Sequence, residues 1–114
     1  MTVIYKICPA SLWAEAERAG VFTGAAIDLK DGYIHFSSGA QVAETAALYF
    51  KGQGGLVLVA VEGDRLGPAL RWEPSRGGAL FPHLYGALPI SAVLWAKPIP
   101  LGGDGRHRLP IAQS

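Results

Sequence analysis

The feature of the sequence that most constrains the fold is a run of six apolar residues, Leu56–Val61, with no polar residue among them. Valine occupies every second position from Val57, and its β-branched side chain favours a strand. A strand with one face in water alternates apolar and polar residues, so an unbroken apolar run indicates a strand covered on both faces. The sequence therefore predicts that 56–61 is the central strand of a sheet.

Other segments are predicted to be strands because they are short, rich in β-branched or aromatic residues and bounded by turn signals. They are Val3–Ile7, Tyr33–Ser37, Leu70–Glu73 and Ile90–Pro100. Val21–Leu29 is predicted to be an extended segment that bends at Gly24. Leu80–Pro89 contains two prolines and a glycine, a composition typical of an irregular segment.

Two helices are predicted, both early in the chain. The first covers Leu12–Ala19, with Ser11 as its capping residue and Gly20 as a left-handed stop. The second ends at Phe50 and is expected to open with a capping box, Ser38–Gln41. The order of elements is then strand, helix, strand, helix and three more strands. This order favours an α+β fold with a mixed or mostly antiparallel, split sheet.

At 114 residues the chain has the length of one domain. We expect a single compact α+β domain over residues 1–101 and a C-terminal tail over 102–114. Half of the residues are hydrophobic and 17% are charged, which excludes a disordered charged protein and leaves apolar surface for a partner such as a second copy. The net charge of +1 excludes a broad nucleic-acid-binding surface.

The cellular setting is predicted from what the sequence lacks. A single cysteine, Cys8, can form neither an internal disulfide nor a CxxC zinc site. No leader pattern is present, and the longest apolar run is too short to cross a bilayer. We expect a cytoplasmic protein without a membrane partner.

The first candidate functional segment is Tyr33–Ser38. Strand alternation would place Tyr33, His35 and Ser37 on one face, and the hydroxyls of Ser37 and Ser38 beside a helix N-terminus that could seat an anion. The alternative is structural: His35 would be a satisfied strand histidine, and Ser38 would only cap the helix.

The second candidate segment is Phe81–Gly86, where His83 and Tyr85 lie two residues apart after a proline. A rigid loop would present both polar tips, whereas a packed aromatic loop would use the imidazole to bind a backbone carbonyl. Because an unperturbed histidine side chain has a pKa of about 6.5, histidines are the natural acid–base candidates, here His35 and His83.

The third candidate is Glu73, which follows a tryptophan at a strand end. Its carboxylate could stabilise a cationic transition state, or it could form a surface ion pair with Arg71 or Arg76. The spacing of the histidines and this carboxylate predicts no metal site. Cys8 has no base near it in sequence to make it a nucleophile.

Four motifs together resemble a bacterial domain-of-unknown-function family, number 952. They are Ile4-Tyr5, Gly32–Ser38 before a helix, Leu70–Glu73 and Leu80–Gly86. The resemblance covers roughly residues 3–99. It implies family membership and brings no established activity.

This family is in turn similar to a compact form of the ADP-ribosyl-transferase fold, which implies such a core here. In that resemblance Lys6 takes the place of a first-strand histidine, Gly32–Ser37 forms the second strand, and Glu73 takes the place of a late glutamate. The resemblance to these enzymes would imply NAD as the cofactor. A lysine cannot reproduce the directed hydrogen bond of an imidazole to a ribose, although it could meet a phosphate, so Lys6 argues against NAD.

The leading hypothesis is a small enzyme that acts on a nucleotide-like or phosphorylated small molecule. The alternative is a non-catalytic module that binds a ligand or a protein through the same residues. The predicted catalytic residues are His35, His83 and Glu73. The predicted ligand-binding residues are Lys6, Ser37, Ser38, Arg71 and Tyr85. No metal is predicted, and no cofactor is assigned.

Overall fold

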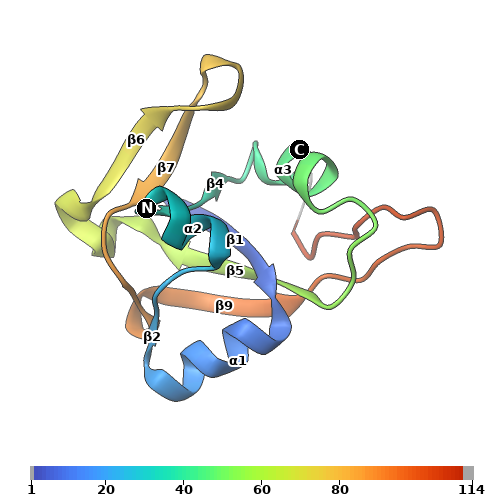
Figure 1. Cartoon of the computed structure of the whole chain (residues 1–114), viewed down its shortest axis with the longest axis horizontal. Helices are drawn as coiled ribbons and strands as arrows, with labels where there is room; N and C mark the ends of the chain where they lie inside the picture. Colours follow the sequence, from blue (N-terminus) through green and yellow to red (C-terminus); the bar gives the residue numbers. More distant parts are fainter. Residues whose placement is uncertain (1, 112–114) are drawn as a thin grey trace.

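Short antiparallel sheets and three α-helices make up the computed structural model, which describes residues 2–111 (Figure 1). The strands are β1 Val3–Pro9, β2 Val21–Phe22, β3 Ile34–His35, β4 Ser37–Ser38, β5 Leu56–Glu62, β6 Leu70–Pro74, β7 Leu80–Leu84, β8 Leu88–Pro89 and β9 Val93–Pro98. The helices are α1 Ala10–Ala19, α2 Ala26–Asp31 and α3 Val42–Tyr49, with 3-10 turns at Gly63–Ala69, Arg76–Gly78 and Ile90–Ala92. The predicted α+β class with antiparallel pairing is confirmed.

The strand predicted from the apolar run is central, as expected. The larger sheet has the order β4-β1-β5-β9, so β5 pairs with a neighbour along each edge. Leu58, Val59, Ala60 and Val61 are fully buried, and only Val57 is half-buried. Because both faces are covered, the strand needs no polar residues on either of them.

The two faces of this sheet bury separate cores. Val59 and Val61 pack with Trp13 and Ala16 of α1, while Leu58 packs with residues of α3 in the second core. Figure 1 shows the two helices on opposite sides of the β1–β5 pair. The α1 helix ends as predicted, at Gly20 with φ of 81°, a conformation that a side chain would strain.

A second sheet, of order β3-β7-β6, corrects the prediction of an irregular Leu80–Pro89 segment. The β6–β7 hairpin projects from the larger sheet in Figure 1. Pro82 lies within β7, and its carbonyl accepts a hydrogen bond from the Phe36 N–H at 3.0 Å. A strand residue directs its N–H and C=O to the same neighbouring segment, so the N–H that Pro82 lacks would have faced Phe36, just past the end of β3. Proline is therefore tolerated here.

Helix starts differ from the predictions. The first helix begins at Ala10 after Pro9, and no side chain caps it, so Ser11 is not a capping residue. Half of the predicted box at the third helix forms: Gln41 Oε1 accepts from the Ser38 N–H at 3.0 Å. Ser38 itself belongs to β4, so its hydroxyl does not cap α3.

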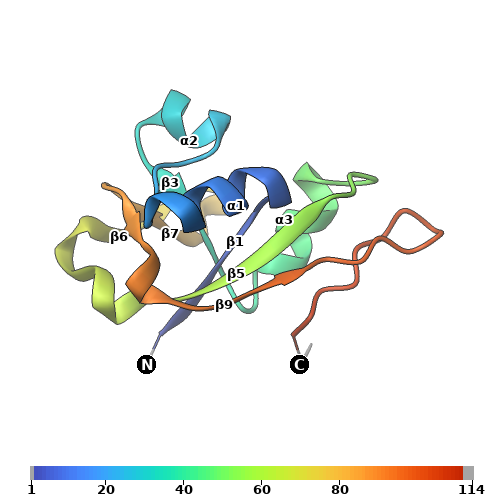
Figure 2. The ribbon, with the colours of Figure 1, turned by 90° about the horizontal axis from the view of Figure 1, so that it is seen from below.

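The predicted extended segment Val21–Leu29 is a two-residue strand followed by α2, a third helix that the sequence prediction missed. The predicted strand Tyr33–Ser37 is divided between two sheets, because β3 joins the smaller sheet and β4 the larger. Phe36 lies between them and is buried. Figure 2 shows α2 standing over β3 at the junction.

The segment after β9 returns to the body. Arg108 N–H donates to the Pro100 carbonyl at 2.8 Å, and His107 Nε2 lies 2.8 Å from the Gln53 carbonyl oxygen. Leu109 and Ile111 pack against the core beneath α3. The last three residues of the predicted tail, 112–114, lie outside the described residues. No helix in residues 2–111 is long and apolar enough to span a bilayer.

Candidate functional site

A cleft of about 530 Å³ opens where the two sheets meet. Strand β4 pairs with β1 only at Ile4 and Tyr5, so on this edge of β1 Lys6 and Ile7 have no strand partner. Residues from this edge, from the β3 segment, from α3 and from β7 line the cleft. Of the predicted site residues, Lys6, His35, Ser37 and His83 are on its wall.

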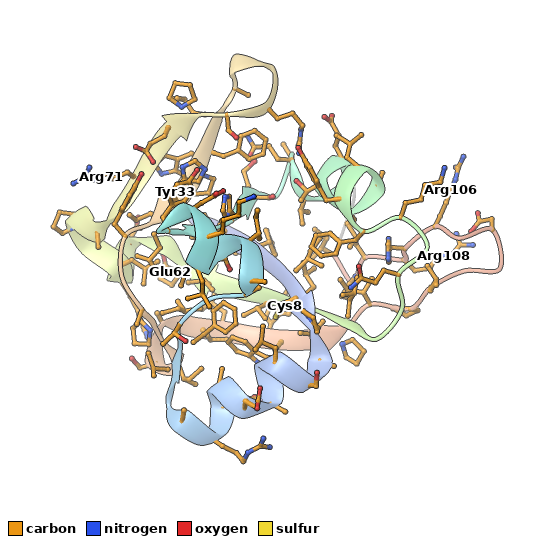
Figure 3. The ribbon with its side chains drawn as sticks, viewed as in Figure 1. Cys8, Tyr33, Glu62, Arg71, Arg106 and Arg108 are labelled. Carbon is orange, nitrogen blue, oxygen red and sulfur yellow. The ribbon has the colours of Figure 1, made fainter. Side chains whose placement is uncertain are left out.

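The two histidines of the site are cross-strand neighbours. His35 of β3 pairs with His83 of β7, and their ring centroids are 5.6 Å apart. The phenol ring of Tyr33 covers both, at 4.6 Å from the His35 ring and 4.2 Å from the His83 ring. Figure 3 shows Tyr33 beside the base of the β6–β7 hairpin. The sequence predicted this proximity, although it expected His83 on a loop.

Glu73 of β6 lies behind His83. Its Oε1 is 2.9 Å from His83 Nδ1 and accepts a hydrogen bond from the Tyr85 hydroxyl at 2.7 Å. These two hydrogen bonds, from Tyr85 and then from His83, lower the pKa of Glu73, so it is a carboxylate at neutral pH. The same bond to Glu73 raises the pKa of Tyr85, which holds its proton.

A carboxylate can only accept, so the contact fixes the tautomer of His83. Nδ1 carries the proton and donates to Glu73, which leaves the lone pair on Nε2. Nε2 has no hydrogen-bond partner within residues 2–111. The one buried, unpartnered side-chain atom in that range is Trp13 Nε1, so His83 Nε2 is not sealed in the core. His83, a lining residue of the cleft, thus has one ring nitrogen without a protein partner among the described residues.

Asp28 of α2 organises the other histidine, and the sequence analysis missed it. Its Oδ1 is 2.7 Å from His35 Nδ1 and accepts the His35 N–H at 3.0 Å. The Lys6 ammonium lies 3.0 and 2.9 Å from its two oxygens. The other ring nitrogen of His35, Nε2, is 3.0 Å from Asp31 Oδ2, so both nitrogens of this ring are engaged by carboxylates.

Asp28 is 2% exposed, yet it is ionised. Burial alone would raise its pKa, but the His35 hydrogen bonds, the Lys6 charge and the Ala25 N–H lower it to about 2. Ala25, the residue before α2, donates to Oδ2 at 2.7 Å, which is half of a capping box. The sequence holds a weak signal for this capping role, because Asp28 is the third residue of a helix. The signal could not be used, since that helix was not predicted.

Gly24 makes room for Asp28. Its φ is 119°, and a Cβ built at this position would lie 2.9 Å from the Asp28 Cβ. The chain therefore passes close to the buried carboxylate only because residue 24 has no side chain. The bend predicted at Gly24 has this structural reason.

The remaining predicted site residues lie at different depths. Ser37 Oγ is 2.9 Å from Thr45 Oγ1 on the cleft wall, whereas Ser38 is not among the residues that line the cleft. The Arg71 guanidinium lies 4.9 Å from the centre of the Tyr85 ring, outside the cleft and on the hairpin at the left of Figure 3. Arg71 is also the cross-strand partner of His83 in the β6–β7 pair, although it is not among the residues that line the cleft.

Arg76 is a cleft residue that the prediction considered only as an ion-pair partner of Glu73. Its Nε is instead 3.2 Å from Glu44 Oε1, and its Nη2 donates to Thr45 Oγ1 at 3.4 Å. No local pattern in the sequence joins residue 76 to α3, because 31 residues separate it from Thr45.

Cys8 does not have the environment of a nucleophile. It is fully buried, and burial raises the pKa of its thiol to about 11, with Lys6 lowering it and Asp28 raising it further. Within residues 2–111, no three His, Cys, Asp or Glu side chains cluster as metal ligands would.

Comparison with known proteins identifies the family. A family model described as "Protein of unknown function (DUF952)" matches residues 7–96. The chain belongs to the DUF952 family. The crystal structure of protein CC0527 from Caulobacter crescentus shares 50% sequence identity with it, at a TM-score of 0.90 and with 94% of each chain covered.

A solution NMR structure of CC0527 gives a similar result for this DUF952 chain. The identity is 52% and the TM-score 0.83, covering 93% of this chain and 91% of that one. A search of the curated proteins found no match. The family resemblance inferred from the four motifs is therefore confirmed, and the chemistry has to be inferred from the cleft.

Proposed function

We propose that this protein is a small enzyme that acts on a nucleotide-like or phosphorylated ligand bound in the cleft, with His83 as its general base. The observation that carries the proposal is the imidazole of His83. A carboxylate holds its Nδ1–H, its Nε2 has no partner among the described residues, and His83 lines a cleft large enough for a small ligand. Carboxylate-oriented histidines of this kind remove protons in many active sites.

The other predicted residues have supporting roles in this proposal. Glu73 orients His83 and stabilises it when it gains a proton. Tyr33 offers an aromatic face beside both imidazoles, against which a ring or sugar could stack. His35, whose two nitrogens are already engaged, positions the ligand rather than moving a proton. Tyr85 and Arg71 support Glu73 from the hairpin.

The proposal includes a fold similar to the ADP-ribosyl-transferase core, supported by the division of one chain segment between two antiparallel sheets. It does not include NAD. Lys6 stands in place of the first-strand histidine, and both oxygens of Asp28 already hold its ammonium group. Lys6 therefore has little freedom to bind a ribose.

A second candidate function is non-catalytic ligand binding. The fixed ring of His35 favours it, because a group with both nitrogens engaged recognises shape rather than exchanging protons. Both the enzyme and the binding module would bind the ligand, so only a measurement of turnover distinguishes the two candidate functions.

The test begins with a thermal-shift screen of the full chain against nucleotides, dinucleotides and phosphosugars. A ligand at about 100 times its Kd stabilises the folded state by about 2.7 kcal/mol. Each ligand that binds is then incubated with the protein and its products are followed by mass spectrometry. We expect turnover by the parent and by His107→Ala, a matched histidine outside the cleft, and none by His83→Ala. Binding without turnover would support the second candidate, and no binding would overturn both.

A further inference from the structure

The position of Arg76 within the cleft indicates what kind of ligand enters it. The guanidinium carbon lies 4.7 Å from the centre of the Phe81 ring and 5.5 Å from that of Tyr49. Contacts with Glu44 and Thr45 of α3 hold the same group from the side. Its side chain is 21% exposed, so this arginine is fixed at the cleft instead of extending into solvent.

The guanidinium keeps hydrogen-bond donors for a ligand. It has five N–H groups, and its contacts within residues 2–111 use one at Nε and one at Nη2. Its ionic partner Glu44 is 66% exposed, so water weakens that pair. Lys6, by contrast, is matched to a buried Asp28. Arg76 is thus the cation on the cleft wall whose charge can still be met by an anion.

Strand geometry relates Phe81, over which Arg76 lies, to His83 of the histidine pair. Phe81 and His83 are two residues apart in β7, so they point to the same face about 6.6 Å apart. Because Arg76 lies over Phe81, an anion bound to it would lie on the Phe81 side of His83, on the same face of β7. The hydroxyls of Ser37 and Thr45 are at the Arg76 end of the cleft, and Thr45 contacts the arginine directly.

We propose that Arg76 forms a phosphate subsite, so that the ligand of this cleft is a phosphate ester whose phosphate binds Arg76 while its sugar or base lies against Tyr33 and His83. This inference rests on the proposed function and specifies its substrate class. Arginine suits the role because its planar fork binds two phosphate oxygens at once. The arrangement is two-ended, with Arg76 and the hydroxyls of Ser37 and Thr45 at one end and the imidazoles with Tyr33 at the other.

Titration calorimetry on the full chain tests this, with adenosine 5′-monophosphate and ribose 5-phosphate as probes. Adenosine, ribose and inorganic phosphate are the partial ligands. We expect both phosphate esters to bind at least tenfold more tightly than their unphosphorylated forms and than phosphate alone. Arg76→Ala should weaken ester binding roughly 10- to 100-fold and leave adenosine binding unchanged. Arg18→Ala removes an equal charge from the end of α1 and should have no effect.

Arg76→Lys and Arg76→Gln separate the role from the fold. Both should keep the parent's thermal midpoint closely enough to be compared, and the lysine variant should recover part of the lost affinity, whereas the glutamine variant should not. Equal affinity for adenosine and its monophosphate would overturn the inference, as would ester binding that is the same in Arg76→Ala and the parent. If the proposed function and its binding-only alternative both fail, no probe binds the parent at all. If only this inference fails, the probes bind and depend on His83 but not on Arg76.

Discussion

Two carboxylate–histidine pairs lie side by side in this protein, and they differ in which partner is buried. In the Asp28 cluster (Lys6, Asp28 and His35) the carboxylate side chain is 1% exposed and the imidazole 30%. In the Glu73 cluster (Glu73, His83 and Tyr85) the order is reversed, with the carboxylate 33% exposed and the imidazole 4%. The Nδ1-to-carboxylate distances, 2.7 and 2.9 Å, are nearly equal.

The same contact therefore has different consequences in the two clusters. Water cannot replace the partners of Asp28, so losing them would leave a charge buried. Water can replace the partners of Glu73, so the contact adds little to stability and mainly sets the orientation and tautomer of His83. The comparison teaches that the Asp28 cluster supports the fold, whereas the Glu73 cluster mainly orients one imidazole.

The largest expected effect is on folding. Asp28→Asn should lower the free energy of unfolding by about 3–5 kcal/mol, because the Lys6 ammonium is left buried without a counter-charge. Urea denaturation at pH 7 measures it. Asp31→Asn is the matched control, since Asp31 contacts the same His35 from a side chain that is 36% exposed, and it should cost under about 1 kcal/mol. Equal costs for the two variants would break the comparison.

A smaller effect is expected in acid. The pKa of Asp28 in the folded protein, about 2, lies below its ordinary value of 3.8, so the ionised form favours folding. This contribution is fully present above about pH 4 and is lost as the pH falls towards 2, for a total of about 2 kcal/mol. Urea midpoints measured from pH 5 to pH 2 should show the loss in the parent and not in Asp28→Asn. A parallel decline in both would assign it to other groups.

The sequence predicted the parts of the fold that depend on local pattern. The unbroken apolar run made β5 central, and Leu70–Glu73 appeared as β6 with little change. The prediction failed at a proline and at a short helix, where contacts with residues distant in sequence determine the local conformation. Pro82 was expected to break a strand, but it lies within β7. It is tolerated there because the two-residue strand β3 ends before the position opposite Pro82 and does not use the N–H that proline lacks.

The candidate site was predicted unevenly for the same reason. His35 and His83 were identified as residue types suited to acid–base chemistry, and the pairing of β3 with β7 brings them together. Asp28 and Arg76 were missed as site residues because their partners are remote in sequence. Lys6 lies 22 residues from Asp28. Such contacts leave no periodic signal, since each depends on the packing of one element against another.

The smallest expected effect on stability comes from Glu73→Gln, which sharpens the comparison at the other cluster. We expect an unchanged urea midpoint, because the glutamine amide can keep a hydrogen bond with the buried His83 ring, and water reaches the partly exposed position 73. The tautomer of His83 should nevertheless change. An amide can donate as well as accept, so it no longer requires a proton on Nδ1. Nitrogen-15 NMR of the histidine rings distinguishes the Nδ1–H form expected in the parent from the Nε2–H form.

Tyr85→Phe is the control for this measurement. It removes the other hydrogen bond to Glu73 Oε1 but leaves the contact with His83 in place, so the parent's tautomer should persist. If Glu73→Gln also keeps the Nδ1–H form, the carboxylate does not set the tautomer, and His83 loses its claim to be a prepared base. If the tautomer shifts while the midpoint stays, then the exposed carboxylate is retained for what it does to the imidazole, since it contributes nothing measurable to the fold.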